Sequence, residues 1–104
     1  FSLKRIEDSG LIDFFIKNKA SHLVLFGSVA RGEDEAKSDI DLVAISGSRG
    51  KLIIRNFENK LRREINLHVF SWAEWKGQAK KNKAFYSDVI SQGISLIGEK
   101  PLVE

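Results

Sequence analysis

Apolar residues recur along this chain at two spacings, which separate predicted helices from predicted strands. Intervals of three and four residues indicate one apolar side of a helix. The segments predicted to be helical are Leu11–Lys19, Leu52–Glu64, a third from Ser71 into the Lys80–Lys83 stretch, and Ala84–Gln92. Gly10 stands at the start of the first of these helices, and Gly93 ends the last one. Ser71, followed three residues later by Glu74, forms a capping box that opens the third helix.

Shorter apolar runs predict strands between these helices. They are His22–Phe26, Ile40–Ile45, Ile65–Phe70 and Ile94–Ile97. The first two runs are apolar almost throughout and are typical of buried strands, closed by Gly27 and by the Ser and Gly cluster at 46–50. The third alternates, which predicts an apolar face with Ile65 and Val69 and a polar face with Asn66 and His68. The alternation of helices and strands predicts an α/β fold.

Length and composition limit what the chain can be. With 104 residues, of which 42% are hydrophobic, it suffices for one domain over residues 1–104 with one modest core. Because such a domain cannot enclose a large substrate, we expect a second molecule to hold anything bigger than a nucleotide. The absence of cysteine excludes disulfides, thiolate metal sites and cysteine nucleophiles. The chain begins with Phe1 and contains no methionine, so we expect that its natural start is missing.

Charge and hydropathy limit the expected cellular location of the protein and the classes of partner that it could bind. No run approaches the roughly 20 apolar residues that span a bilayer, and the first residues lack a signal-peptide layout, so we expect a cytoplasmic protein with no membrane partner. The net charge of +3 comes from 17 basic and 14 acidic residues. This excess is too small to indicate nucleic acid and fits a solvated, charged surface.

Candidate chemistry lies between the first two predicted strands. Asp39 and Asp41 are two apart on a strand, so their side chains share a face, with Cα atoms about 6.6 Å apart. Two converging carboxylates are hard oxygen ligands that suit Mg²⁺ or Mn²⁺. The turn of Gly27 and Ser28 adds an anion site, because glycine lets a phosphate approach the backbone and a short helix after it offers N–H groups.

Each of these features also has an ordinary explanation. A glycine after a strand is usually only a turn, and aspartates at the start of a strand are often solvated ends. Together they carry more weight, because a short loop would bring the phosphate-binding turn and the acid pair into one place.

The same stretch resembles the nucleotidyltransferase superfamily of the DNA polymerase beta type. Ten residues, Val29 to Ser38, separate Ser28 from Asp39, which is the spacing of that superfamily's Gly-Ser and Asp-x-Asp signature. The dipeptide Arg31-Gly32 is also typical of it. Together with the length, this makes the chain similar to the minimal nucleotidyltransferases of archaea and bacteria over nearly all of its residues. The resemblance implies an α/β (α+β) nucleotidyltransferase fold with a small mixed β-sheet flanked by helices.

The resemblance also implies an activity. It is the magnesium-dependent transfer of a nucleotidyl group, AMP from ATP in the usual case, to a hydroxyl, with loss of pyrophosphate. In many members the acceptor is a tyrosine of a HEPN-type toxin, for which the minimal protein is the antitoxin. Carried over to this sequence, Gly27 and Ser28 hold the triphosphate, while Asp39 and Asp41 are the catalytic residues and bind Mg²⁺ or Mn²⁺.

One position departs from the family pattern. The family has a third carboxylate on the next strand, where this chain has Asn66. An amide is a neutral, weaker ligand and cannot act as a base. Glu64 and His68 lie two residues either side of it and are candidates to compensate, although Glu64 stands about 6.6 Å too far along the strand for the same metal. The sequence therefore leaves two alternatives, an active enzyme and a degenerate module that binds a nucleotide or a protein partner without turnover.

Two further groups of residues have weaker claims. Trp72 and Trp75 could stack on a base, but aromatic residues at helical spacing more often belong to the core or to a subunit contact. The basic residues of the second predicted helix could contact nucleic acid or an acidic partner, and a solvated helix face explains them better. They are Arg55, Lys60, Arg62 and Arg63. The acceptor, the preferred base and the oligomeric state stay open.

Overall fold

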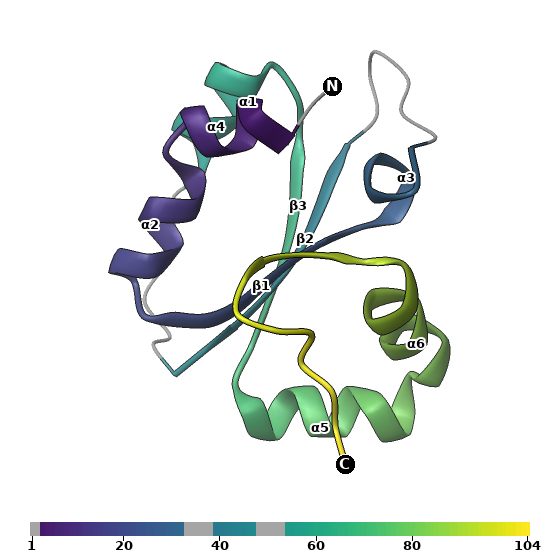
Figure 1. Cartoon of the computed structure of the whole chain (residues 1–104). Coiled ribbons are helices and arrows are strands. Elements are labelled where there is room, and N and C mark those ends of the chain that lie inside the picture. The colour runs from purple at the N-terminus through teal and green to yellow at the C-terminus, as the bar shows by residue number, and fades with distance from the viewer. Residues whose placement is uncertain (1–2, 33–38, 48–53) are drawn as a thin grey trace.

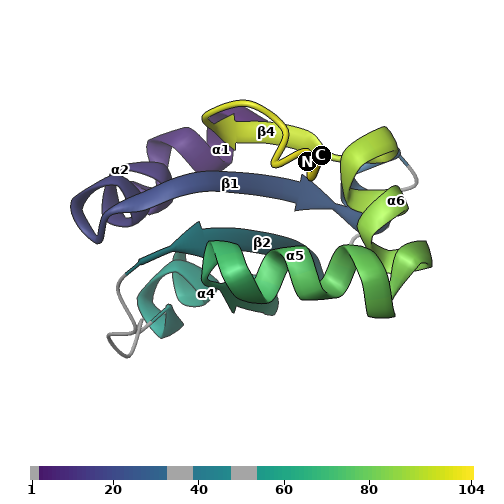
Figure 2. The ribbon, with the colours of Figure 1, turned by 90° about the horizontal axis from the view of Figure 1, so that it is seen from below.

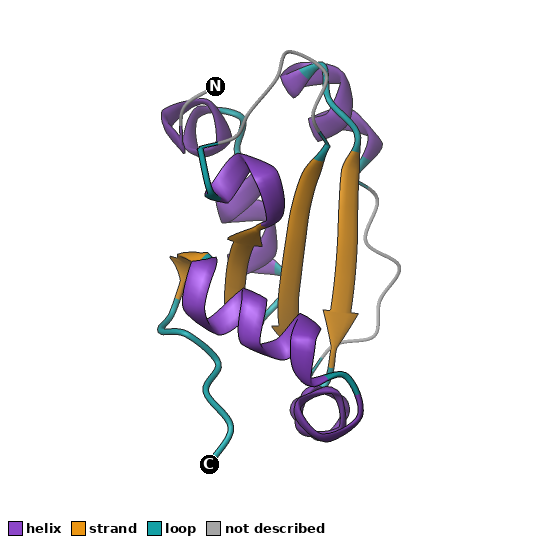
Figure 3. Cartoon of the chain, turned by 90° about the vertical axis from the view of Figure 1, so that its right-hand side faces the viewer, coloured by secondary structure: helices purple, strands orange, loops and turns teal. Residues whose placement is uncertain are grey.

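The computed structural model describes residues 3–32, 39–47 and 54–104 of the chain. Within these residues the strands are β1 (Ala20–Phe26), β2 (Ile40–Ser46), β3 (Ile65–Phe70) and β4 (Ile94–Ile97). They form one mixed sheet in the order β3-β2-β1-β4, in which β1 runs antiparallel to β2 and to β4, while β2 and β3 run parallel. Figure 1 shows the sheet in the middle of the molecule, and Figure 3 shows its strands side by side.

Helices lie on both faces of this sheet. The described helices are α1 (Leu3–Asp8), α2 (Leu11–Lys17), α3 (Gly27–Ala30), α4 (Arg55–Leu61), α5 (Trp72–Lys81) and α6 (Lys83–Gln92). One face carries α1, α2 and α4, and the opposite face carries α5 and α6 (Figure 2). The short helix α3 continues directly from β1. A small mixed sheet flanked by helices is the fold class that the sequence predicts.

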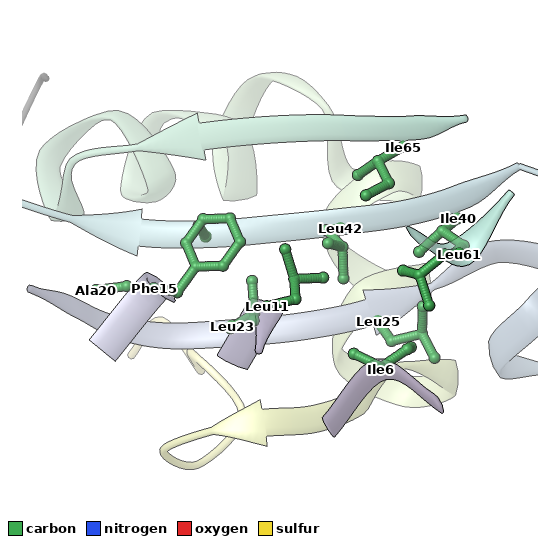
Figure 4. Packing of buried hydrophobic residues seen from close by; sticks show 11 residues of the cluster. Ile6, Leu11, Phe15, Ala20, Leu23, Leu25, Ile40, Leu42, Leu61 and Ile65 are labelled. Carbon is green, nitrogen blue, oxygen red and sulfur yellow. The ribbon is translucent and has the colours of Figure 1, made fainter. Parts of the chain in front are cut away.

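Among the described residues the core forms two clusters rather than the single one expected, because β1 and β2 are buried on both faces. The larger cluster joins alternate residues of these strands, such as Leu23 and Leu42, to Phe15 of α2 (Figure 4). The other cluster joins the residues between them, such as Val24, to Trp75 of α5. The consecutive apolar residues 23–26 of β1 and 42–45 of β2 therefore contribute to both layers of the core.

The helix boundaries agree with the sequence predictions to within one residue except at α1, α2 and α4. Helix α2 ends at Lys17 instead of Lys19, which adopts a left-handed conformation with φ of 62°. Leu52 lies outside the described residues, and α4 ends at Leu61 instead of continuing to Glu64, because Arg62 adopts a left-handed conformation with φ of 55°. Helix α1 was not predicted. Its six residues contribute a single buried side chain, Ile6, so its sequence has no periodicity to detect.

Strand β3 departs from the expected division into an apolar and a polar face. On the face predicted to be apolar, Ile65 is buried but Val69 is 39% exposed, because β3 is an edge strand. On the face predicted to be polar, Phe70 packs against Trp75 with ring centroids 5.5 Å apart. Buried and exposed side chains therefore alternate as predicted at the start of β3 but not at its end.

Local signals for helix ends are confirmed. The Ser71 hydroxyl accepts a hydrogen bond from the Glu74 N–H at 3.1 Å, and the Glu74 carboxylate accepts one from the Ser71 N–H at 3.0 Å. Gly10 precedes α2 in a left-handed conformation, and Gly93 caps α6. No helix in the described part of the chain has the length and the apolar character to cross a bilayer.

The two tryptophans have different environments. Trp75 is fully buried, and its indole N–H donates a hydrogen bond to the Pro101 carbonyl at 2.6 Å, so it belongs to the core as expected. Trp72 is 38% exposed, and its ring stacks on His22 with centroids 5.8 Å apart. Neither tryptophan is on the strand ends that carry the acid pair.

Candidate active site

Three strand ends meet at one edge of the sheet and bring the predicted site residues together. Strand β1 ends at this edge, while β2 and β3 begin there, since β1 is antiparallel to β2 and β2 is parallel to β3. The pairing register places Phe26 opposite Asp41 on one side and Asn66 opposite Asp41 on the other. Asp41 is thus the central residue of the site.

The Gly-Ser turn lies against this central acid. Gly27 has φ of 75°, a left-handed conformation that disfavours any side chain. A Cβ atom at this position would collide with the Asp41 carboxylate. Glycine is therefore required for two reasons, its backbone conformation and the close approach of the acid. Ser28 follows in the first turn of α3 and is partly buried, as expected for the start of a short helix after β1.

The acid pair converges as the strand spacing predicts, and Asn66 lies between the two carboxylates. The Asn66 amide nitrogen donates hydrogen bonds to Asp39 Oδ2 at 3.2 Å and to Asp41 Oδ1 at 3.0 Å. Both aspartates are partly buried and Asn66 is exposed, so the carboxylates are open to solvent on one side. Residues 25 and 27 positions apart in the chain therefore share one polar cluster.

This donor set fits a divalent cation in part. Asp39 and Asp41 supply two hard carboxylate ligands. The third position offers an amide, which is neutral and which directs its nitrogen, a donor, toward the acids. Within residues 3–32, 39–47 and 54–104, no group of three or more His, Cys, Asp or Glu side chains is arranged to hold a metal ion.

The neighbours of Asn66 take other positions. Glu64 lies just before β3, where its backbone carbonyl accepts a hydrogen bond from the Ile40 N–H at 2.8 Å. His68 lies two residues beyond Asn66, among the rings of Phe26 and Phe85, with centroids 6.0 Å and 5.5 Å away. The backbone of Glu64 thus holds the start of β2, and the His68 ring packs among aromatic side chains.

Two residues near the site had no assigned role in the sequence. Arg31 caps α3, and its Nη1 lies 3.6 Å from Asp88 Oδ1 of α6, which ties the short helix to the opposite layer. Glu58 of α4 accepts a hydrogen bond from the Ile65 N–H at 2.9 Å and so fixes the start of β3 next to Asn66. Arg31 follows Gly27 by one helical turn, so the sequence alone could have indicated that Arg31 lies near the site. Glu58 carried no signal, because only the folded chain brings it to β3.

A comparison of the sequence with protein families agrees with this geometry. The family model for "Polymerase beta, Nucleotidyltransferase" matches residues 10–101. The chain belongs to this family. The match covers the Gly-Ser turn, the acid pair and Asn66, so the resemblance seen in the motif is confirmed at the level of the family. No curated protein sequence matches the chain.

Solved structures share the nucleotidyltransferase fold of this chain. One is the crystal structure of a toxin-antitoxin with AMP-PNP, which is 21% identical and has a TM-score of 0.65 over 90% of this chain and 74% of that chain. Another is a toxin-antitoxin MntA-HpeT variant with two aspartates changed to glutamate, which is 18% identical with a TM-score of 0.64 over 89% and 74%. A tyrosine-to-alanine variant of MntA-HpeT is 19% identical with a TM-score of 0.60 over 89% and 73%.

Proposed function

We propose that this chain transfers AMP from ATP to a hydroxyl, in a reaction that depends on Mg²⁺ or Mn²⁺. The observation that carries the proposal is the contact between the two halves of the site. Gly27 lies so close to Asp41 that a methyl group would not fit between them, and Asp39 converges on the same point. An anion at the turn and a cation at the acids would therefore be neighbours, as phosphoryl transfer requires.

The residues of the site would divide the work. Gly27 and Ser28 would hold the triphosphate through backbone N–H groups and a hydroxyl. Asp39 and Asp41 would hold the cation, which when bound would offset negative charge on the phosphate oxygens. The acceptor oxygen would bond to the α-phosphorus as the bond to the bridging oxygen breaks, the hydroxyl proton would pass to water, and pyrophosphate would leave.

The solved structures support a protein partner. Toxin-antitoxin complexes share the fold of this chain, and one of them is described with AMP-PNP, a nucleoside triphosphate analogue. A variant in which two aspartates two positions apart are changed to glutamate was made in one of these systems. These findings support an antitoxin with a protein partner. From the family resemblance we propose that it is cytoplasmic and that the acceptor is a tyrosine hydroxyl on a HEPN-type toxin.

Asn66 favours a second candidate function. Without a third carboxylate, the chain would bind the nucleotide or the toxin and would not turn over. In that case the antitoxin would act by occupying its partner rather than by modifying it.

Labelled ATP distinguishes the two functions. The protein is incubated with Mg²⁺, a candidate HEPN-type toxin and ATP labelled on the α-phosphate, with γ-labelled ATP as a parallel control. We expect covalent label on the toxin from the α-labelled ATP alone, and none with the Asp41→Asn variant. Binding of the toxin without covalent label would favour the degenerate module, and label from the γ-phosphate would refute nucleotidyl transfer.

A further inference from the structure

The amide of Asn66 forms a bridge between the two acids of the site. One NH₂ group has two protons, and here each is directed to a different carboxylate, Asp39 at 3.2 Å and Asp41 at 3.0 Å. Asn66 is exposed and its side chain is not part of either hydrophobic cluster. The interaction with the acids is therefore the main role that the structure gives to this side chain.

Electrostatics explains why such a bridge matters. Two carboxylates that converge repel each other unless a cation or a hydrogen-bond donor lies between them. The Asn66 NH₂ group supplies the donor in the free protein. An aspartate at the same position has nearly the same shape, but it offers no proton when ionised and adds a third negative charge.

We infer that Asn66 is a positioning residue that keeps the acid pair assembled in the metal-free protein and lowers the affinity of the site for a free divalent cation. The inference rests on the proposed function in taking Asp39 and Asp41 as metal ligands. A cation would then enter the site together with the triphosphate, whose oxygens complete the ligand set, and not ahead of it. Metal binding would thus be regulated by the nucleotide, because the cation binds tightly only when the triphosphate is bound as well.

Two substitutions separate the contributions of the amide. Asn66→Asp removes the donor and adds a ligand, whereas Asn66→Leu removes the donor and adds nothing. Asn56→Asp, at an exposed position on α4, is the matched control for added charge. The measurements are calorimetric titration with Mn²⁺ alone and thermal unfolding with and without Mn²⁺, in the absence of any nucleotide.

The expected results differ for each variant. The wild type and Asn56→Asp should bind Mn²⁺ weakly, and their melting temperatures should not respond to it. Asn66→Asp should bind Mn²⁺ at least about tenfold more tightly, equivalent to about 1.4 kcal/mol. Its metal-free melting temperature should fall by about 4 °C or more and recover when Mn²⁺ is added. Asn66→Leu should also melt earlier, but Mn²⁺ should not restore it.

Clear results would overturn the inference. If wild type binds free Mn²⁺ as tightly as Asn66→Asp, the amide does not lower metal affinity. If Asn66→Asp and Asn66→Leu both melt at the wild-type temperature without metal, the amide does not hold the acids together. Neither measurement involves ATP or an acceptor, so a failure of nucleotidyl transfer would be recognised separately, by the absence of covalent label.

Discussion

Replacing Gly27 with alanine is the sharpest single test of the site, because the added methyl group meets the acid directly. Gly27 has φ of 75°, so the substitution strains the backbone. The new Cβ would also collide with the Asp41 carboxylate, whose other oxygen accepts the hydrogen bond from Asn66. Relief of that collision requires the carboxylate to rotate away from its partner.

A second glycine provides the matched control. Gly32 has nearly the same backbone conformation, with φ of 73°, but a Cβ there would meet no atom of the described residues within 4 Å. The left-handed conformation costs an alanine about 1 to 2 kcal/mol, and this cost applies to both variants. Loss of the hydrogen bond to a charged Asp41 adds about 1.5 to 3 kcal/mol to Gly27→Ala alone. The difference between the two variants therefore isolates the contact with the acid.

Chemical denaturation and calorimetry measure the two consequences. We expect Gly32→Ala to lose about 1 to 2 kcal/mol of unfolding free energy, on the same backbone estimate, and to bind ATP with Mn²⁺ normally. Gly27→Ala should be less stable than Gly32→Ala and should bind ATP with Mn²⁺ at least about tenfold more weakly, because its ligand is displaced. If Gly27→Ala binds as well as Gly32→Ala, the turn and the acid pair do not act together, and the reasoning fails.

Three further predictions concern the acids and the scaffold. Asp39→Asn and Asp41→Asn should each abolish divalent-dependent ATP binding in calorimetry while the circular dichroism spectrum stays unchanged; unchanged affinity in both would remove the metal site. Trp75→Phe should cost about 1 to 3 kcal/mol in denaturant titrations, because the buried Pro101 carbonyl loses its donor. Ser71→Ala should cost about 1 kcal/mol in the same assay through loss of the capping box, and a wild-type midpoint would contradict this.

Short-range patterns predicted much of this fold. The run at 40–45 and the alternation from Ile65 onward depend only on neighbouring residues, and both strands begin where predicted. The capping box at Ser71 is equally local. By contrast, Val69 is exposed and Phe70 is packed because of the position of β3 at the edge of the sheet and of α5 on one face. The sequence does not contain that arrangement in any local pattern.

The site shows the same division. The spacing of Asp39 and Asp41 was enough to predict that they share a face, and the motif was enough to predict the family. The hydrogen bonds of Asn66 to both acids depend on the register between β2 and β3, which no local signal specifies. For that reason the sequence identified Asn66 as a missing carboxylate, whereas the structure also gives it a positive role as a donor.

The pairing of β3 on one side only makes ligand binding and local stability interdependent. An edge strand opens more readily than a central one, and when β3 opens, Asn66 leaves the acids and one wall of the site is lost. A ligand that contacts the ends of β1, β2 and β3 together binds only the closed sheet and shifts the equilibrium toward it. Hydrogen exchange of the β3 amides would therefore slow when a ligand binds. The slowing would extend along the whole strand, including amides that do not contact the ligand.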